Sequence, residues 1–381
     1  MKGAGFIVYN ERMENLVLYR KYRPKTFSEI VGQEHIVMTL TNALRQNKVA
    51  HAYLFTGPRG TGKTTVARLL AKAVNCEKNI SNSKFEPCNQ CPACSEINNS
   101  RSLDLIEIDA ASNRGIDEIR ELREGIKFSP NRLKYKVFVI DEVHQLTPPA
   151  FNALLKTLEE PPAHIIFILA TTEAGKVPQT IISRCQRFDF HKLPLEKISG
   201  RLARLAELEK VKIEKTALQL IALNADGSIR DGESLLDQVM AIAGEDKNIT
   251  LEEVRTILGI ADIQMVENLI GCLGEKNISQ AVNHINQVAN EGYDLNQFAK
   301  SLINYLRKMM VLKIDAGLAG LAAPEMTEEQ VGAVISQSQK FSEAELTKLI
   351  RLFIQAENEI RFSNLPQLPL ELAIVECCGG E

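Results

Sequence analysis

A glycine-rich octapeptide most strongly constrains what this chain can fold into. It reads Gly57-Pro58-Arg59-Gly60-Thr61-Gly62-Lys63-Thr64. The apolar run 51–56 before it is typical of a buried strand, and residues 65–74 after it carry apolar side chains at helical spacing. Between a strand and a helix, such a loop closes backbone N–H groups around phosphate oxygens at the positive end of the helix. The alternative is a glycine-rich turn that carries Gly-Lys-Thr by chance.

Two residue pairs extend this phosphate site. Lys63 is expected to reach the β- and γ-phosphates of a nucleotide, and the Thr64 hydroxyl to hold Mg²⁺. Further along, an apolar run ends in Asp141-Glu142. Asp141 would orient Mg²⁺ through its water ligands, and Glu142 would polarise the attacking water. The alternative is a polar strand end with two solvated acids.

Strand-like and helix-like segments alternate between these motifs. Residues 104–109, 136–142 and 165–170 are nearly continuous apolar strands, whereas 116–128 and 148–158 have helical spacing. This alternation predicts an α/β domain with a parallel sheet covered on both faces. Ligands of such sheets bind at the carboxyl ends of the strands, where the phosphate loop and Asp141-Glu142 both fall.

The composition is that of a globular protein with two or three domains. The chain has 381 residues, of which 45% are hydrophobic and 24% charged. No apolar run approaches the roughly 20 residues that span a membrane, and the start does not resemble a secretory signal, so we expect a cytoplasmic protein. The net charge of −3 gives no global basic field, so any nucleic-acid contact must come from a local patch or several subunits together.

Four of the eight cysteines have the spacing of a metal site. Cys76, Cys88, Cys91 and Cys94 form a C-x11-C-x2-C-x2-C pattern. Four thiolates suit tetrahedral Zn²⁺ without an open position, which predicts a structural site. An iron–sulfur cluster also uses cysteine ligands, and disulfides are disfavoured in a reducing cytosol.

The rest of the chain reads as helical. Short amphipathic helices are expected from 195 to about 244, and no second nucleotide motif follows. Apolar residues recur at helical spacing in 251–258, 263–273, 278–289, 295–312 and 344–362, and 327–339 fits a loop leading into one more helix. Packing within one monomer and packing between subunits are both compatible with this periodicity.

Several further motifs, in this order, resemble those of clamp-loader ATPases. With the four cysteines inside the nucleotide domain, they are similar to the γ/τ family of bacterial DNA polymerase III subunits over nearly the whole chain from about Leu16. The motifs are Tyr19-Arg20-Lys21-Tyr22-Arg23-Pro24 with Phe27 and Val31-Gly32-Gln33, Ile140-Asp141-Glu142-Val143-His144, Leu154 to Pro162, Ala170-Thr171-Thr172, Ser183-Arg184-Cys185 and Gly227-Ser228-Ile229-Arg230-Asp231.

The resemblance implies a fold and a function. The fold is α/β: an AAA+ phosphate-loop domain over 16–195 with a parallel sheet and a zinc-binding insertion at 76–94, then a small helical lid over 196–244 and an all-α collar over 245–381. The function is that of an ATP-driven subunit that loads the sliding clamp on primed DNA. The implied cofactors are ATP, Mg²⁺ and structural Zn²⁺, and the implied partners are other clamp-loader subunits, the clamp and the backbone of primed DNA. Polymerase chemistry has no candidate residues here.

The resemblance also assigns roles that spacing alone does not. Thr172 resembles the sensor of the γ-phosphate, Arg184 an arginine finger that acts in trans on a neighbouring subunit, and Arg230 a second sensor in cis. From the residues alone, a surface salt bridge is the better explanation of each arginine, and only the family resemblance favours these roles. The expected nucleotide-binding set is Tyr19, Arg23 and Val31 on the adenine side, Arg230, and the loop Gly57, Pro58, Arg59, Gly60, Thr61, Gly62, Lys63, Thr64 and Thr65.

Contacts with DNA phosphates are expected from Arg114, Arg120 and Lys156. Relatives have a basic residue directly after Ala-Ala-Ser, whereas this chain has Asn113 there and Arg114 one place later. A solvated helix face is the alternative. Several subunits that each give one or two such contacts would bind DNA without sequence preference and with strong salt dependence.

The two ends of the chain and three other functions complete the expectations. The chain ends where the collar normally ends, so the helicase and polymerase tethers of the long τ form are expected to be absent. Residues 1–15 fit a short extension or a start at Met13. The alternative functions are a non-hydrolysing scaffold subunit, a branch-migration motor and, more remotely, a metal-centred redox protein. The intact phosphate loop disfavours the scaffold, and the cysteine set with Ser-Arg-Cys disfavours the motor.

Overall fold

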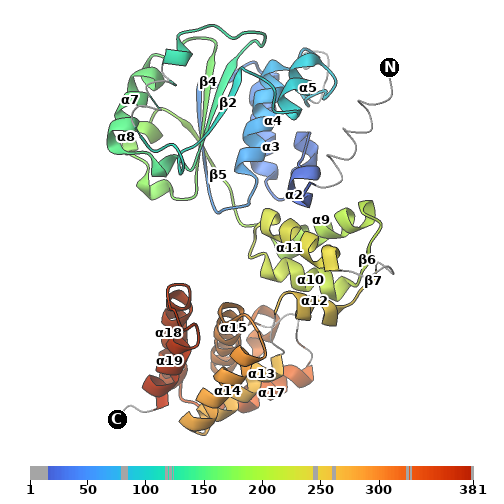
Figure 1. The fold of residues 1–381 in the computed structure, drawn as a ribbon, viewed down its shortest axis with the longest axis vertical. Helices are drawn as coiled ribbons and strands as arrows, with labels where there is room; N and C mark the ends of the chain where they lie inside the picture. The colour runs from blue at the N-terminus through green and yellow to red at the C-terminus, as the bar shows by residue number, and fades with distance from the viewer. Residues whose placement is uncertain are drawn as a thin grey trace. The chain divides into compact units, whose positions relative to one another are not determined.

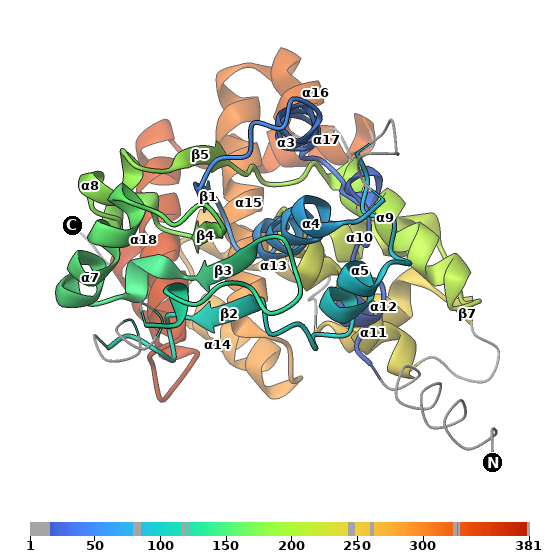
Figure 2. The same ribbon diagram turned by 90° about the horizontal axis from the view of Figure 1, so that it is seen from above.

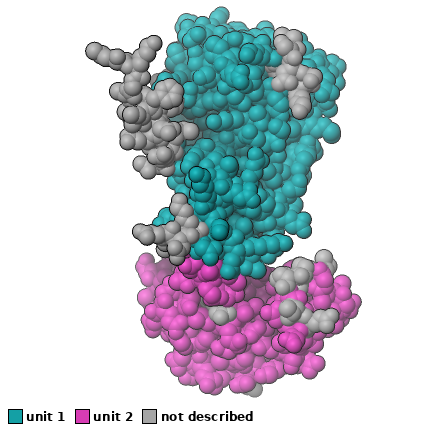
Figure 3. Space-filling model, turned by 90° about the vertical axis from the view of Figure 1, so that its right-hand side faces the viewer, with its two compact units in different colours: residues 1–249 teal, residues 250–381 magenta. Residues whose placement is uncertain are grey.

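A computed structural model describes residues 16–78, 85–115, 119, 122, 124–242, 248–259, 263–322, 326 and 328–378. The expected extension 1–15 and the candidate DNA contact Arg120 lie outside these residues. The chain divides into two compact units, residues 1–249 and 250–381 (Figure 3). Each unit has its own hydrophobic core.

The first unit is built on a five-stranded sheet whose strands are all parallel. The order is β2-β3-β4-β1-β5, so β1, which leads into the phosphate loop, lies between β4 and β5. In this register Thr56 at the end of β1 pairs with Thr171 at the end of β4. The strands are β1 (Ala52–Thr56), β2 (Leu105–Asp109), β3 (Lys136–Asp141), β4 (Ile165–Thr171) and β5 (Gln186–Asp189).

Helices cover both faces of this sheet (Figures 1 and 2). On one face α3 (Glu34–Arg45) and α4 (Lys63–Asn75) pack against alternate residues of β1, such as Tyr53 and Phe55. On the other face α7 (Pro148–Glu159) and α8 (Gln179–Ile182) pack against the intervening residues, such as Leu54. Because strand side chains alternate in direction, a sheet buried on both faces needs the continuous apolar runs found here. The predicted parallel sheet covered on both faces is confirmed.

Short elements connect the sheet and its helices. The helix predicted over 116–128 lies partly outside the described residues, and residues 124–126 are helical. Strand β5 was not predicted because only Phe188 of its four residues is buried. The connecting elements are α2 (Leu18–Lys21), η1 (Phe27–Glu29), α5 (Pro92–Asn98), η3 (Val143–Gln145) and η4 (Ala174–Lys176).

The remainder of the first unit is a small helical layer. It consists of α9 (Leu195–Leu208), α10 (Lys215–Asn224) and α11 (Ile229–Ile242), with a short parallel pair of β6 (Lys212–Ile213) and β7 (Asn248–Ile249). The apolar faces of the helices pack on one another through residues such as Leu202, Ile221 and Leu236. Helix α11 carries Arg230 in its first turn.

The second unit is all helical in the residues that the structure describes. Its central helix α15 packs against α13, α17 and α18 and buries Phe298, Leu302, Leu306 and Met309. Among the described residues, no helix is both long and apolar enough to cross a membrane. The unit contains α12 (Leu251–Ile257), α13 (Ile263–Gly274), α14 (Ile278–Asn290), α15 (Leu295–Ile314), η5 (Ala316–Leu318), α16 (Ala319–Ala322), α17 (Glu328–Ser338), α18 (Glu343–Ile360) and α19 (Leu368–Cys378).

Candidate nucleotide site and cysteine cluster

The phosphate loop runs from the end of β1 to the start of α4, as its sequence predicts. Gly57, Gly60 and Gly62 have φ of +138°, +72° and +103°, a region that side chains other than glycine rarely adopt. Space also excludes a side chain at Gly57, where a Cβ would lie 2.2 Å from the carbonyl oxygen of Phe190. The loop therefore keeps its backbone open toward a ligand at the first turn of α4.

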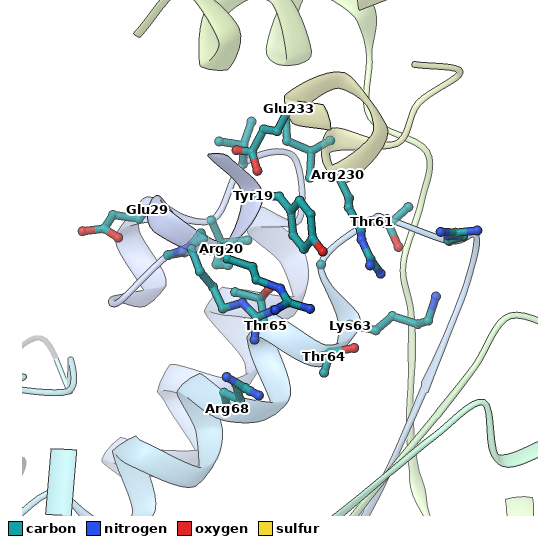
Figure 4. A pocket seen from close by; sticks show the side chains of 18 of the residues that line it. Tyr19, Arg20, Glu29, Thr61, Lys63, Thr64, Thr65, Arg68, Arg230 and Glu233 are labelled. Atoms are coloured by element: carbon teal, nitrogen blue, oxygen red, sulfur yellow. The ribbon is translucent and has the colours of Figure 1, made fainter. Parts of the chain in front are cut away.

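A cavity of about 300 Å³ lies against this loop (Figure 4). Most of the expected nucleotide-binding residues line it, whereas Gly57, Pro58, Thr172 and Arg184 do not. The expected residues that line it are Tyr19, Arg23, Val31, Arg59, Gly60, Thr61, Gly62, Lys63, Thr64, Thr65, Asp141, Glu142 and Arg230.

Lys63 is buried and its ammonium is held by the loop itself. Its Nζ donates to the carbonyl oxygens of Gly57 and Pro58, each at 2.7 Å. Burial lowers the pKa of Lys63, and the charges of Glu142 and Asp141 oppose that shift. A buried ammonium close to two carboxylates provides the positive charge that a phosphate group needs.

Asp141 brings the end of β3 into contact with the phosphate loop. The Thr64 hydroxyl donates to Oδ2 of Asp141 at 2.7 Å. A hydroxyl and a carboxylate at this distance are oxygen donors of the kind that Mg²⁺ prefers. The two residues expected to hold and orient Mg²⁺ are therefore neighbours.

Glu142 is held by the neighbouring strand. Thr172, directly after β4, donates to Oε2 of Glu142 from its hydroxyl at 2.8 Å and from its backbone N–H at 3.2 Å. Glu142 has φ of +48°, a left-handed conformation that is uncommon for residues other than glycine. The backbone turn after β3 and these two hydrogen bonds fix the carboxylate at the edge of the cavity.

Tyr19 lies between two guanidinium groups at the other end of the cavity (Figure 4). The Cζ atom of Arg230 is 4.7 Å from the centre of the Tyr19 ring, and that of Arg20 is 5.7 Å away. Hydrogen bonding to Arg230 is the main cause that lowers the pKa of Tyr19. Tyr19 and Arg230, which are 211 positions apart in sequence, thus form one wall of the site.

A buried ion pair that the sequence analysis missed also lines the cavity. Arg201 on α9 contacts Glu233 on α11 at 3.0 Å, and donates to the carbonyl oxygen of Tyr22 at 2.6 Å. The two side chains are only 9% and 7% exposed. Burial raises the pKa of Glu233, and the charge of Arg201 opposes the shift. This pair joins two helices of the small layer to the segment that follows Tyr19.

Ser228 and Ile229 connect helix α11 to the phosphate loop. The backbone N–H of Ile229 donates to the carbonyl oxygen of Gly60 at 3.1 Å. A Cβ on Gly60 would lie 1.8 Å from Oγ of Ser228. Gly60 is therefore required both by its backbone conformation and by this close approach.

Arg184 is placed away from the cavity, on the far side of the sheet. Its Nη2 contacts Oε1 of Glu159 at 2.6 Å, and its Nη1 donates to the carbonyl oxygen of Thr180 at 2.7 Å. The side chain is 32% exposed. Arg184 does not line its own chain's nucleotide cavity, and it is held at the surface by the end of α7.

The two described candidates for DNA contact differ in their surroundings. Arg114 donates from Nε to the carbonyl oxygen of Ala111 at 2.9 Å, so its guanidinium lies beside the Ala-Ala-Ser turn. Lys156 lies on α7, where its side chain is exposed and makes no hydrogen bond or ion pair with any described residue.

The four expected metal ligands come together. The sulfur atoms of Cys76, Cys88, Cys91 and Cys94 all lie within 4.8 Å of one another, and none is in a disulfide. Backbone N–H groups point at these sulfurs, as from Cys91 to Cys88 at 3.3 Å and from Cys88 to Cys76 at 3.4 Å. Burial opposes ionisation of Cys88, but the N–H groups of Gln90 and Cys91 outweigh it and lower its pKa to about 6. Three buried thiols and the half-buried thiol of Cys88, with N–H···S bonds, fit a closed metal site and are compatible with structural Zn²⁺.

Lys72 ties this cysteine cluster to the nucleotide domain. It lies on α4, nine residues after Lys63, and its ammonium donates to Oδ1 of Asn89 at 2.7 Å and of Asn98 at 2.9 Å. A third bond, of 2.8 Å, reaches the carbonyl oxygen of Lys25. Burial lowers the pKa of Lys72 to about 8.

Other residues line the nucleotide cavity without having been expected there. Three of these eight residues, Arg20, Pro24 and Ile229, belong to motifs named above that gave them no role, and the three-dimensional packing brings all eight to the site. They are Arg20, Pro24, Glu29, Ile30, Arg68, Arg201, Ile229 and Glu233.

Three family models match consecutive parts of the chain. Residues 32–194 match the model described as DNA polymerase III, delta subunit. Residues 197–245 match the DNA polymerase III clamp loader subunit, ATPase lid domain. Residues 249–379 match DNA polymerase III subunits gamma and tau domain III.

Similar proteins of known identity agree with these matches. The chain is 44% identical over 366 residues to the DNA polymerase III subunit tau of Bacillus subtilis, covering 96% of this chain and 64% of that protein. It is 41% identical over 325 residues to the subunit tau of Escherichia coli, covering 85% of this chain and 50% of that protein. A solved structure of the Thermotoga maritima RuvB Holliday junction branch migration motor is 20% identical with a TM-score of 0.47, covering 71% of this chain and 86% of that chain.

Proposed function

This chain belongs to the gamma/tau family of DNA polymerase III clamp-loader subunits, and on that premise we propose that it binds and hydrolyses ATP to load a sliding clamp on primed DNA. The observation that carries the proposal is the meeting of Lys63, Thr64 and Asp141 at one cavity, with Thr64 and Asp141 bonded at 2.7 Å. ATP would place its phosphates at the phosphate loop and its base toward Tyr19, Arg23 and Val31.

Each residue has a proposed task in ATP hydrolysis. Lys63 would exchange its bonds to Gly57 and Pro58 for bonds to phosphate oxygens. Mg²⁺, when bound, would neutralise charge on the β- and γ-phosphates. Glu142 would accept a hydrogen bond from the attacking water, Thr172 would sense the γ-phosphate, and Arg230 would contact the nucleotide from the lid.

Arg184 is proposed to complete the site of a neighbouring subunit. Its place outside its own cavity and its exposure support a role in trans. A supplied arginine stabilises the charge that develops during phosphoryl transfer. Partners are accordingly other clamp-loader subunits, the clamp and primed DNA, with Arg114, Arg120 and Lys156 as candidate phosphate contacts.

The domain roles and the metal are part of the same proposal. Residues 16–195 would be the ATPase domain, 196–244 the lid and 245–381 the collar that assembles subunits. Structural Zn²⁺ would be held by the four cysteines and would stabilise the insertion without a part in hydrolysis. The protein would be cytoplasmic, because a clamp loader acts on the bacterial chromosome.

A second function, a nucleotide-gated scaffold subunit that does not hydrolyse ATP, is favoured by one observation. Thr172 donates both of its hydrogen bonds to Oε2 of Glu142, so this carboxylate oxygen is already engaged. The two functions differ in a phosphate-release assay on the assembled loader, with and without clamp and primed template.

Glu142→Gln makes that assay specific. We expect it to retain ATP binding while phosphate release falls roughly 10²–10⁴-fold, as when a general base is lost. Absence of stimulated phosphate release by the unaltered chain in a complex that binds ATP would favour the scaffold function.

A further inference from the structure

A second cavity, of about 430 Å³, lies beside the nucleotide cavity and is unusually basic. It is bounded by the segment around α2, by α4 and by the end of α5. Among the described residues, five cationic side chains and no acidic side chain line it, together with Asn98, Ser100 and four apolar residues. The cations are Arg20, Arg23, Lys25, Arg68 and Lys72.

The positive charge of this cavity is only partly balanced. Glu107 pairs with Arg68 at 2.5 Å, and Glu29 accepts the backbone N–H of Lys25 at 2.7 Å. The side chains of Arg20, Arg23 and Lys25 make no ion pair with any residue that the structure describes. Counted over the described residues, five cations and two nearby acids leave three positive charges in excess, which is costly in a partly enclosed space.

Two groups in the wall show this imbalance individually. Nε of Arg68 is buried and has no hydrogen-bond partner in the part of the chain that the structure describes. A buried donor without a partner costs free energy that a ligand acceptor would recover. The pKa of Arg23 is lowered, first by burial and then by the charge of Arg68. Arg23 and Arg68 line the nucleotide cavity as well as the basic cavity, so they lie between the two.

We propose that this basic cavity, lined by Arg20, Arg23, Lys25, Arg68 and Lys72, binds a small anion with at least two phosphate groups. The site is distinct from the phosphate loop. Three excess cations match a diphosphate better than a single sulfate, and guanidinium forks bind phosphate oxygens in pairs. Because Arg20, Arg23 and Arg68 are shared, its occupancy is coupled to the nucleotide site.

Lys25 is the position for the test because it lines the basic cavity and not the nucleotide cavity. Its side chain is exposed, so Lys25→Glu leaves the packing of the core intact. Lys48 is the matched control: it is also exposed, has no side-chain partner among the described residues and lines neither cavity. Inorganic pyrophosphate is titrated by calorimetry into the full chain with saturating ADP at the phosphate loop.

We expect one pyrophosphate per chain with ADP present. Lys25→Glu should weaken the affinity for pyrophosphate roughly tenfold, because a charge-assisted contact is lost. Lys48→Glu should leave this affinity unchanged. Sulfate and inorganic phosphate, titrated in parallel, should bind at least about tenfold more weakly, because one tetrahedral anion cannot reach all the cations.

Three results would overturn the proposal: no pyrophosphate binding beside ADP, equal loss in both lysine variants, or equal affinity for sulfate. The test remains independent of the proposed ATPase function. If ADP itself fails to bind, the ATPase proposal fails, and the same titration on Lys63→Ala still decides whether the basic cavity binds pyrophosphate.

Discussion

Thr172 donates two hydrogen bonds to the same carboxylate oxygen of Glu142, one from its hydroxyl at 2.8 Å and one from its backbone at 3.2 Å. The ends of β3 and β4 are neighbours in the sheet, which is why residues 30 positions apart meet. A γ-phosphate that accepted the Thr172 hydroxyl bond would leave Glu142 with one donor fewer. The sensor and the general base of the proposed mechanism are therefore one hydrogen-bonded unit.

Thr172→Val tests that unit. It removes the hydroxyl donor while keeping the shape and the backbone bond, so we expect ATP affinity to change less than about threefold. Turnover should fall roughly 10- to 100-fold, because the carboxylate loses its fixed position. Thr172→Ser is the control and should retain most activity. Steady-state ATPase assays measure both variants, and equal turnover would contradict a role for the Thr172 hydroxyl.

Lys63→Ala tests the phosphate loop. It removes the buried ammonium held by Gly57 and Pro58, and we expect ATP binding to weaken by at least about 100-fold. Lys48→Ala serves as the exposed control. Calorimetry measures both, and tight binding by Lys63→Ala would remove the loop from the nucleotide site.

Arg184→Ala tests the contribution in trans. ATP binding by the chain should be unaffected because Arg184 lies outside its own cavity. DNA-stimulated turnover of the assembled complex should fall by at least about 100-fold. Arg187→Ala is the matched control, since Arg187 is also an exposed arginine in an ion pair, with Asp189. Similar turnover for the two variants would contradict the role of Arg184 as an arginine finger.

Cys94→Ser tests the metal. The variant should lose close to one zinc per chain and lower the melting temperature by more than about 5 °C, because metal binding contributes to folding. Cys185→Ala is the control: burial raises its thiol pKa to about 12, and it belongs to no cysteine cluster in the described residues. Elemental analysis decides the metal, and iron in place of zinc would refute the ligand argument.

Asp104→Asn tests a stabilising carboxylate with a defined pH dependence. Three backbone N–H groups, of Asn131, Arg132 and Leu133, donate to Asp104 at 2.7–3.0 Å. Burial would raise its pKa, but these bonds outweigh burial and lower it below 3.8. The carboxylate thus adds stability above its unfolded pKa and loses it as pH falls through the folded pKa.

At pH 7 we expect Asp104→Asn to cost about 1–3 kcal/mol of unfolding free energy. The difference from the unaltered chain should shrink below about pH 4, as the native carboxyl becomes protonated. Urea unfolding across this range measures it, and a cost that does not change with pH would contradict the assignment. Asp226→Asn is the control, because Asp226 is exposed and its carboxylate pairs with Lys192 alone among the described residues.

The sequence predicted those parts of the site that lie on local motifs. The phosphate loop is fixed by glycine conformations, and Cys76 to Cys94 by ligand spacing, so both were found from residues alone. Arg201 and Glu233 were missed because only the packing of α9 on α11 brings them together. Strand β5 was missed for a related reason: its pairing with β1, rather than its own polar sequence, makes it a strand.

The bond from Ile229 to Gly60, with Ser228 packed where a side chain of residue 60 would be, has a mechanical consequence. The first turn of α11 cannot swing outward without breaking that bond or moving the phosphate loop. A bound triphosphate that stiffened the loop would therefore also restrain the orientation of α11. It would do so through the loop, without needing to contact α11 itself.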